Sequence, residues 1–433
     1  MRYLFVLIFI CNLAYGENNK NSIDSVLSNY IRDFQISSPV SVLNNDPKKY
    51  KFGKLLFEDK VLSLANNVSC KTCHNDKFGT GDAIPFSIGA GGSGNGINRR
   101  QNLAGITSRN APHLFNKAHS SFRGLFWDGR VSYNKRLNTY NTPEAKLNGE
   151  NPEYSFISNK IDSLIAMQAL FPLVNEIEMK GVLFPKFTNL MVWKELTRRV
   201  VENPKYLDYV FEGFNIADIA NALAYFQKVE FQVNDTPLDH YISGKIDVLS
   251  KNEKKGAIIF FEKGRCARCH FGPLLSNRSF QSVSVPQIGP GQTKDKNDEG
   301  RFLVTKNVND KYKFLTQPLR NISLTAPFFH NGAFNGLAEV VDHYNNPSQS
   351  IHNYDVGNLQ NLFGTNYNEY IFVDRNQYNN FYRVQSLNNI LKTPLRLSNI
   401  EKRNLVCFLK KSLTQEKFHN KINLDECEAK DLE

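Results

Sequence analysis

Two short stretches, Cys70-Lys71-Thr72-Cys73-His74 and Cys266-Ala267-Arg268-Cys269-His270, decide how this chain is interpreted. Both have the pattern C-x-x-C-H, which attaches haem in c-type cytochromes. Two thiols three residues apart lie on one helical turn and can bond both vinyl groups of one porphyrin, while the histidine that follows is held under the iron. A zinc site typically joins paired cysteines within one site, whereas these pairs lie far apart and each has its own histidine. The sequence therefore predicts two covalently bound c-type haems, with His74 and His270 as iron ligands.

The first residues predict export. Arg2 precedes an apolar run from Tyr3 to Cys11, and Ala14-Tyr15-Gly16 fits a small-x-small cleavage pattern, so residues 1–16 are interpreted as a signal peptide. The alternative is a retained anchor, but the run is too short to span a bilayer, and no later stretch offers about 20 apolar residues. We expect a periplasmic protein with no integral membrane segment in the mature chain. Export also argues against nucleic acid as the partner of the net charge of +11.

Helical periodicity outweighs strand signals along the chain, whose 41% hydrophobic and 22% charged composition excludes wholesale disorder. The fold class expected is mainly α, with two cytochrome-c-like haem domains and the active site near their interface. A loose polar leader (17–45) precedes an N-terminal haem domain (46–240), a C-terminal haem domain (241–415) and a tail (416–433). Helices are expected at Ile23–Phe34, Lys51–Phe57, Ile216–Val229, Lys254–Phe261 and Ile400–Leu413.

Three further segments are expected to be irregular. The glycine-rich stretch 79–96 reads as a loop. Residues 132–160 and 346–386 look like polar, Asn-rich insertions, and the second carries five tyrosines. The second insertion is interpreted as a long surface loop with half-buried aromatic rings, the alternative being a lid or docking surface.

Cys407 and Cys427 form a disulfide or remain as two thiols; an oxidising compartment permits the bond.

The chain resembles the bacterial di-haem cytochrome c peroxidases and their MauG-like relatives from about Lys51 to Leu413. The resemblance rests on motifs in a shared order around the two haem motifs: Gly53-Lys54-Leu55-Leu56-Phe57, Arg109-Asn110-Ala111-Pro112, Phe126-Trp127-Asp128-Gly129-Arg130, Gln168-Ala169, Pro172, Glu178-Met179, Asp298-Glu299-Gly300-Arg301-Phe302, Leu319-Arg320-Asn321, Leu324-Thr325-Ala326-Pro327 and His330-Asn331-Gly332.

The resemblance implies a division of labour between the haems. The haem held by Cys70, Cys73 and His74 would react with peroxide, and the haem held by Cys266, Cys269 and His270 would relay electrons to it. Glu178 matches the family's distal acid, which moves a proton between the two peroxide oxygens so that water leaves. Gln168 and Pro172 match the MauG-like distal set, and Glu176 is a nearby competitor of Glu178. Trp127 matches the tryptophan between the haems.

One departure from the family concerns the glycine-rich loop. Many family peroxidases place a histidine there, in a Ser-Ile-Gly-His context, and it can block the first haem until the second is reduced. Here the run is Ser87-Ile88-Gly89-Ala90, and alanine cannot ligate iron. The first haem is therefore expected to be open when fully oxidised. His113 and His119 are downstream candidates for the missing ligand, although a lone histidine there is more often structural.

A second departure concerns the sixth ligand of the second haem, which is usually methionine in the family. The methionines are Met1, Met167, Met179 and Met191, and none follows Cys266. Tyr344 stands at the aligned position, where MauG-like proteins use tyrosine. The adjacent His343 is its rival and would give bis-histidine ligation, and the remaining alternative is that both residues only pack in a helix. Asn110, with the carbonyls of Thr325 and Pro327, matches a calcium site between the domains.

These features predict a periplasmic di-haem peroxidase that reduces H2O2 to water, with a small c-type cytochrome or cupredoxin as electron donor. The first alternative is a MauG-like enzyme that uses peroxide to form a high-valent di-haem state and oxidises a partner protein. The second is a plain electron-transfer protein with two six-coordinate haems, against which the distal glutamate motif argues.

Overall fold

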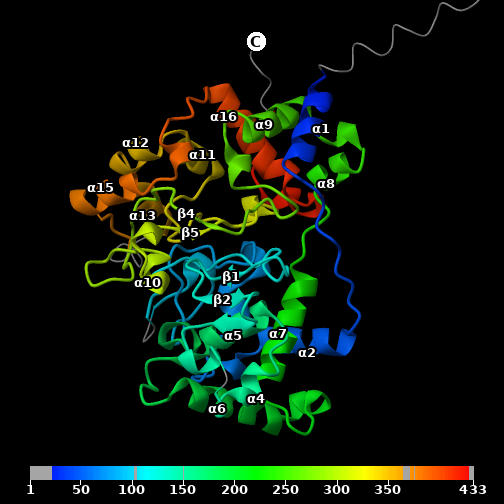
Figure 1. The fold of residues 1–433 in the computed structure, drawn as a ribbon, viewed down its shortest axis with the longest axis vertical. Helices are drawn as coiled ribbons and strands as arrows, with labels where there is room; N and C mark the ends of the chain where they lie inside the picture. The colour runs from blue at the N-terminus through cyan, green and yellow to red at the C-terminus, as the bar shows by residue number, and fades with distance from the viewer. Residues whose placement is uncertain (1–21, 102–104, 150, 364–370, 375, 429–433) are drawn as a thin grey trace, which may run out of the picture.

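The computed structural model describes residues 22–101, 105–149, 151–363, 371–374 and 376–428. The described chain forms two stacked halves that are mainly helical (Figure 1). The N-terminal half, at the bottom of Figure 1, holds the first C-x-x-C-H motif, and the C-terminal half above it holds the second. The predicted signal peptide, residues 1–16, lies outside the described residues. Among the helices that the structure does describe, none has both the length and the apolar character that crossing a bilayer needs.

The N-terminal half combines six helices with one small antiparallel sheet in the order β1-β2-β3. Its elements are α2 (Pro47–Glu58), α3 (Cys70–Cys73), β1 (Gly124–Leu125), β2 (Val131–Asn134), β3 (Thr139–Asn141), α4 (Ser155–Ser158), α5 (Leu164–Val174), α6 (Asn189–Glu202) and α7 (Ile216–Glu230).

The C-terminal half contains a second, two-stranded antiparallel sheet. Its elements are α1 (Ile23–Asp33), α8 (Pro237–Ile242), α9 (Lys251–Phe261), β4 (Phe280–Gln281), α10 (Phe302–Thr305), β5 (Phe314–Leu315), α11 (Leu337–Asn345), α12 (Pro347–His352), α13 (Gly357–Phe363), α15 (Gln377–Gln385), α16 (Asn399–Cys407) and α17 (Asp425–Glu428). The five helices expected from the sequence are all present, each within a few residues of its expected range apart from the end of α16. There, the helix is followed by a short π-helical turn at Phe408–Ser412.

Each half is built on a helix pair that crosses at a glycine. A Cβ at Gly53 of α2 would lie 2.1 Å from the carbonyl oxygen of Ala222 in α7, and a Cβ at Gly256 of α9 would lie 2.0 Å from that of Asn404 in α16. Only glycine permits so close an approach of two backbones. In both pairs the glycine-bearing helix precedes a C-x-x-C-H motif. This shared device supports the interpretation of a duplicated unit.

The leader is not loose over its described part. Its helix α1 packs against α9 of the C-terminal half, where the rings of Tyr30 and Phe261 stack with centroids 5.5 Å apart. The carboxylate of Asp24 pairs with Lys254 at 2.7 Å and accepts a hydrogen bond from Tyr241 at 2.7 Å. The sequence showed only polar composition here, and the apolar stripe of α1 is short, so its packing partner was not predictable.

The glycine-rich stretch 79–96 is irregular, as expected, but much of it is buried between the halves. Ile84, Phe86 and Ile88 form a third apolar cluster with Val285, Ile288 and other side chains of the C-terminal half. The loop therefore contributes to the junction that holds the two halves together.

The expectation of a surface loop at 346–386 is wrong for the described part, which folds into α12, α13 and α15 at the edge of the C-terminal half (Figure 1). Tyr378 and Tyr382 of α15 are largely exposed, whereas Tyr354 donates a hydrogen bond to the carbonyl of Ala333. Tyr367 and Tyr370 lie outside the described residues. Residues 132–160 form β2, β3, α4 and their connections.

Cys407 and Cys427 form a disulfide, which ties α17 to α16. Of the two arrangements that the sequence left open, the structure therefore has the bonded one. Cys70, Cys73, Cys266 and Cys269 are free thiols.

Candidate active site

The first C-x-x-C-H motif lies on a short helix whose start is capped. The backbone N–H of Ser69 donates to the Thr72 hydroxyl at 3.0 Å, and Cys70 and Cys73 follow on the single turn of α3. The ring of His74 is positioned by Nδ1, which lies 3.0 Å from the carbonyl oxygen of Thr80. A carbonyl can only accept, so Nδ1 carries the proton and Nε2 keeps its lone pair. This is the tautomer that an iron ligand needs.

A single cavity brings together the first motif and the predicted distal residues. Cys70, Cys73 and His74 line it on one side, and Gln168, Pro172 and Glu178 line it as well. Gln168 and Pro172 are four residues apart on α5, which places them on one face of the helix. Glu178 lies in the helical turn Glu176–Lys180 that follows α5, where the side chain of Asn175 accepts the backbone N–H of Glu178 at 3.0 Å.

The two glutamates of this turn differ in their surroundings. Glu178 lines the cavity, and desolvation raises the pKa of its carboxyl while the charge of Arg130 opposes the shift. Among the described residues, no side chain hydrogen-bonds its carboxylate. Glu176 instead points outward, with 57% of its side chain exposed, and pairs with Lys180 at 3.3 Å. The geometry therefore separates the predicted distal acid from its competitor: Glu178 faces the cavity and Glu176 faces solvent.

The second motif has the same local design. The N–H of His270 donates to the carbonyl of Cys266 at 2.9 Å, and the ring Nδ1 of His270 lies 2.9 Å from the carbonyl oxygen of Leu275. Nε2 is again left with its lone pair. Burial lowers the pKa of His270 to about 4, so the ring is neutral at physiological pH. Cys266, Cys269 and His270 line a second, mainly apolar cavity in the C-terminal half.

Tyr344 and His343 are neighbours on α11 but face different surroundings. Tyr344 lines the second cavity together with the cysteines and His270, and burial raises the pKa of its phenol. His343 is absent from that lining. Its Nε2 lies 2.8 Å from the carbonyl oxygen of Val283 and its Nδ1 lies 2.9 Å from the hydroxyl of Ser350. Both ring nitrogens of His343 are thus engaged by protein groups.

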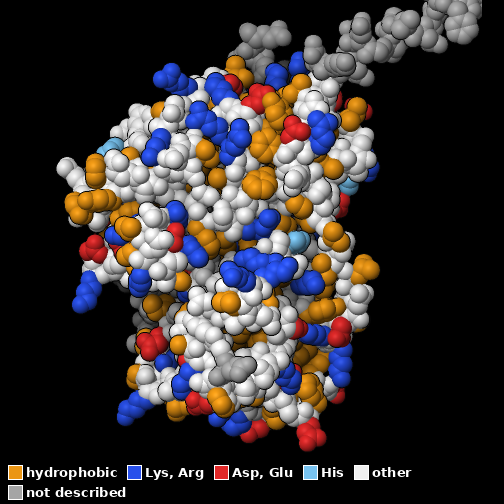
Figure 2. Space-filling view, viewed as in Figure 1, with side chains coloured by type: hydrophobic (Ala, Val, Ile, Leu, Met, Phe, Trp, Pro, Cys, Tyr) orange, Lys and Arg blue, Asp and Glu red, His pale blue; other side chains and the backbone are white. Residues whose placement is uncertain are grey.

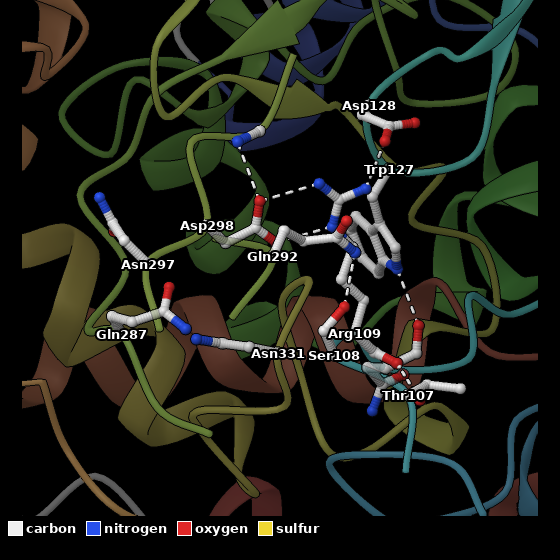
Figure 3. Close-up of polar contacts among 12 residues, drawn as sticks. Thr107, Ser108, Arg109, Trp127, Asp128, Gln287, Gln292, Asn297, Asp298 and Asn331 are labelled. Carbon is white, nitrogen blue, oxygen red and sulfur yellow. Dashed lines mark hydrogen bonds and ion pairs between the residues drawn. The ribbon is translucent and has the colours of Figure 1, made fainter. Parts of the chain in front are cut away.

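Trp127 lines both cavities and is the side chain expected between the haems. Its indole N–H donates to the carbonyl oxygen of Asn110 at 2.9 Å. The next residue, Asp128, accepts from Arg109 at 2.6 Å, and Arg109 also donates twice to Asp298 of the C-terminal half, at 2.7 and 2.8 Å. Figure 3 shows this guanidinium bonded to both carboxylates. All three charged side chains are buried.

The ion triad of Arg109, Asp128 and Asp298 was missed in the sequence analysis, although each residue belongs to a motif quoted there. A general rule could have indicated such a cluster, because arginines and carboxylates are rarely buried unless they pair with each other. Asp298 is separated from Arg109 by 189 positions, so no spacing rule joins them.

The loop at Ala90 does not reach the first cavity through its side chain. The backbone N–H of Ala90 lies 3.0 Å from the carbonyl of Ile177 and 3.1 Å from that of Glu178. A Cβ at the preceding Gly89 would lie 1.6 Å from the Ile177 carbonyl, so this close contact requires glycine. His113 lines the second cavity and His119 a third one, so neither substitutes for the missing histidine in this structure.

The predicted calcium ligands lie near one another at the junction. Asn110, Thr325 and Pro327 all line the second cavity. However, the side-chain nitrogen of Asn110 faces the carbonyl oxygens of Ile84 at 3.1 Å and Pro327 at 3.4 Å. Calcium binds oxygen, so a calcium site at these residues needs the Asn110 amide turned to present its oxygen.

The two C-x-x-C-H motifs fit haem better than Asn110, Thr325 and Pro327 fit calcium. Each cavity presents two free thiols and a histidine whose Nε2 is available, which is the donor set of a c-type haem. A family model described as di-haem cytochrome c peroxidase matches residues 47–247. Cytochrome c551 peroxidase of Pseudomonas aeruginosa is 28% identical over 317 residues, which cover 71% of this chain and 75% of that protein. Residues 47–247 of this chain are therefore similar to the di-haem cytochrome c peroxidase family.

Two other relatives have similar sequence identities to this chain. Methylamine utilization protein MauG of Methylorubrum extorquens is 26% identical over 306 residues, 69% of each chain. Cytochrome c peroxidase Ccp of Escherichia coli is 29% identical over 294 residues, 67% of this chain and 51% of that protein. The relatives from Pseudomonas aeruginosa and Escherichia coli are both named as cytochrome c peroxidases.

Solved structures support the fold. A MauG-like protein associated with microbial copper homeostasis superposes with a TM-score of 0.59 at 24% identity, covering 88% of this chain and 94% of that one. The di-haem peroxidase BthA of Burkholderia thailandensis gives 0.59 at 18% identity, covering 90% and 93%. The expected mainly helical fold of this chain is therefore confirmed over most of its length.

Proposed function

We propose that the chain is a periplasmic di-haem peroxidase that reduces H2O2 to water, with electrons passing from the C-terminal haem to the N-terminal haem. One observation carries the proposal: Cys70, His74, Gln168 and Glu178, from three separate segments, line one cavity. The donor is a small c-type cytochrome or cupredoxin. The export motif at residues 1–16 supports the compartment.

The first haem, when bound through Cys70, Cys73 and His74, supplies an iron that binds peroxide and accepts electrons. The carboxylate of Glu178 takes the proton from the inner peroxide oxygen and delivers it to the outer one, so that the O–O bond breaks and water leaves. Burial raises the pKa of Glu178, which makes its carboxylate a better proton acceptor than an exposed one. The Gln168 amide offers a donor that orients peroxide. Overall, H2O2, two protons and two electrons give two waters.

The path for the electrons runs through the junction. Trp127 borders both cavities, which supports an indole relay between the haems. At the second cavity, Tyr344 would hold the haem iron together with His270, since both ring nitrogens of His343 are engaged by protein groups. Calcium at Asn110, Thr325 and Pro327 completes the proposal, and it requires the Asn110 amide to turn so that its oxygen faces the Pro327 carbonyl.

The neighbouring glutamates provide a matched test. Glu178→Gln should abolish peroxide turnover while both haems stay attached, because the amide cannot take up the proton; the loss should be about 10²-fold or more. Glu176→Gln, two residues away and exposed, should leave turnover unchanged. Peroxide consumption with a reduced cytochrome c and the haem content per chain are measured for both. Full turnover by Glu178→Gln would remove Glu178 from the mechanism.

A MauG-like activity, in which peroxide drives oxidation of a partner protein, is the second candidate. It is favoured by Ala90, which leaves no histidine on the loop, and by Tyr344 in the second cavity. Absorption and EPR spectra of the fully oxidised protein before and after one equivalent of H2O2 distinguish the two. An immediate change favours the MauG-like cycle, whereas no change until one electron is added favours a peroxidase gated by the second haem. Tyr344→Met should suppress the immediate change.

A further inference from the structure

A third cavity lies in the N-terminal half, beside the first haem cavity, and has a volume of about 1050 Å³. We call it the insertion cavity, because residues of the 132–160 segment form one of its walls. The helices α5 and α7 border both cavities: Ile165 and Ala224 face the insertion cavity, and Gln168 and Leu223 face the haem cavity. Neither the haem motifs nor the distal residues line it, so the proposed peroxide chemistry does not account for it.

Basic side chains gather in the lining of the insertion cavity. Lys117, His119, Arg123 and Lys228 all line it. Burial lowers the pKa of His119, and the charges of the nearby Arg278 and Lys228 lower it further. Lys and Arg side chains also gather at mid-height of the molecule in the view of Figure 2. A concentration of cations without matching acids attracts an anion.

Lys117 gives the strongest indication. The residue is only 7% exposed, and the ammonium lies 5.3 Å from the centroid of the Phe122 ring. Among the described residues, no carboxylate pairs with this ammonium and no acceptor hydrogen-bonds it. Burial without compensation lowers its pKa to about 7. A buried amine that keeps no protein partner is costly, and an anion in the cavity would remove that cost.

The remaining lining shows what kind of anion fits. Asp162 is the one carboxylate among the lining residues, and it is already paired with Lys49 at 3.0 Å. The rings of Tyr133 and Tyr140, from β2 and β3, lie 5.2 Å apart on the insertion side. Leu147 and Ile161 add apolar surface. The lining thus combines basic side chains with aromatic and apolar ones, which matches a ligand with an anionic head and an apolar body.

We propose that the insertion cavity binds a small organic anion whose carboxylate meets Lys117 and whose aromatic or apolar body lies against the 132–160 segment. This inference does not depend on the proposed peroxidase function, since it uses none of the haem-site residues. Its ligand is a separate small molecule and not the peroxide.

Calorimetry on the haem-loaded protein tests the proposal with benzoate as probe and benzamide as its uncharged isostere. Benzoate should bind, and benzamide should bind at least about tenfold more weakly, because a charge-assisted hydrogen bond is worth about 1.5–3 kcal/mol. Inorganic phosphate should also bind more weakly than benzoate, because it lacks the apolar body. Equal affinity for benzoate and benzamide would refute the claim that the ligand has an anionic head. Tighter binding of phosphate than of benzoate would refute the claim that it has an apolar body.

Two variants locate the site. Lys117→Met should weaken benzoate at least about tenfold. Lys194→Met removes the same charge from an exposed position on α6 and should leave the affinity unchanged. Lys228→Met serves as a second cavity variant if Lys117→Met fails to fold, as judged by circular dichroism and haem content. Unchanged affinity in the folded cavity variant, or no binding heat with millimolar benzoate, would refute the proposal.

Discussion

Replacing Asp298 with asparagine tests whether the junction between the halves depends on the ion triad. Asp298 is 2% exposed and accepts two hydrogen bonds from Arg109, at Nε and Nη2. Asparagine keeps the size of the side chain, but it presents an amide nitrogen to one of these donors. Arg109 retains its bond to Asp128, which spares it from being entirely unpaired.

The magnitude follows from the burial of the triad. Removing one partner of a buried ion pair costs about 3–5 kcal/mol, and the remaining Asp128 contact places this variant at the lower end, about 3 kcal/mol. The pKa of Asp298 is held below its ordinary value of 3.8, with burial opposing the shift and Arg109 overcoming it. A carboxylate with a depressed pKa contributes stability above its unfolded value and loses it as pH falls through the folded value. The difference between wild type and variant should therefore shrink below about pH 4.

Guanidinium chloride unfolding of the haem-loaded protein at pH 7 measures the effect, followed by circular dichroism and by haem absorption. Asp342→Asn is the matched control, because Asp342 pairs with Lys402 at 2.8 Å but has 59% of its side chain exposed. That change should cost less than about 1 kcal/mol. If Asp298→Asn loses no more stability than the control, or if its loss does not depend on pH, the triad does not stabilise the junction as argued.

Two further perturbations give results of opposite sign. Lys117→Met should stabilise the protein by about 4 kcal/mol at pH 7, because the buried ammonium has its pKa lowered from 10.5 to about 7. The gain in stability should disappear as pH rises to about 10.5, because there the unfolded chain also loses the proton. Unfolding curves between pH 7 and 10 measure the gain. A gain that does not depend on pH would contradict its origin in the buried ammonium. Cys407→Ser should cost about 3 kcal/mol, the loop-closure entropy for a sequence separation of 20. Reductant should lower the Tm of the wild type but leave the Tm of the variant unchanged. Equal Tm values of wild type and variant without reductant would contradict a stabilising role of the disulfide.

The sequence predicted well where local spacing determines the chemistry. The C-x-x-C-H motifs fix two thiols and a histidine on one turn, and the structure places both sets in cavities. The pair Gln168 and Pro172 shares a helix face by its spacing alone. Glu178 came from the resemblance to the family, and the structure adds the reason that it differs from Glu176: one faces the cavity and the other faces solvent.

Prediction failed where contacts join distant segments. The leader was expected to be loose because its composition is polar, but a few apolar side chains suffice to bind α1 to α9. Residues 346–386 contain many asparagines, which disfavour helix interiors, yet Asn346 and Asn376 act as N-caps of α12 and α15. Tertiary packing and capping outweighed intrinsic propensity in both cases.

Arginine suits position 109 because of the contacts that surround Trp127. Trp127 is held on one side by its bond to the Asn110 carbonyl and is followed by Asp128, which Arg109 binds. Arg109 directly precedes Asn110, so the Arg109 side chain and the carbonyl of the next residue together hold the segment that carries the indole. The same guanidinium donates two hydrogen bonds to Asp298, and it therefore links the segment that carries the indole to the C-terminal half as well. Lysine carries the same charge but no planar fork, and so it could not meet carboxylates from both halves in this geometry.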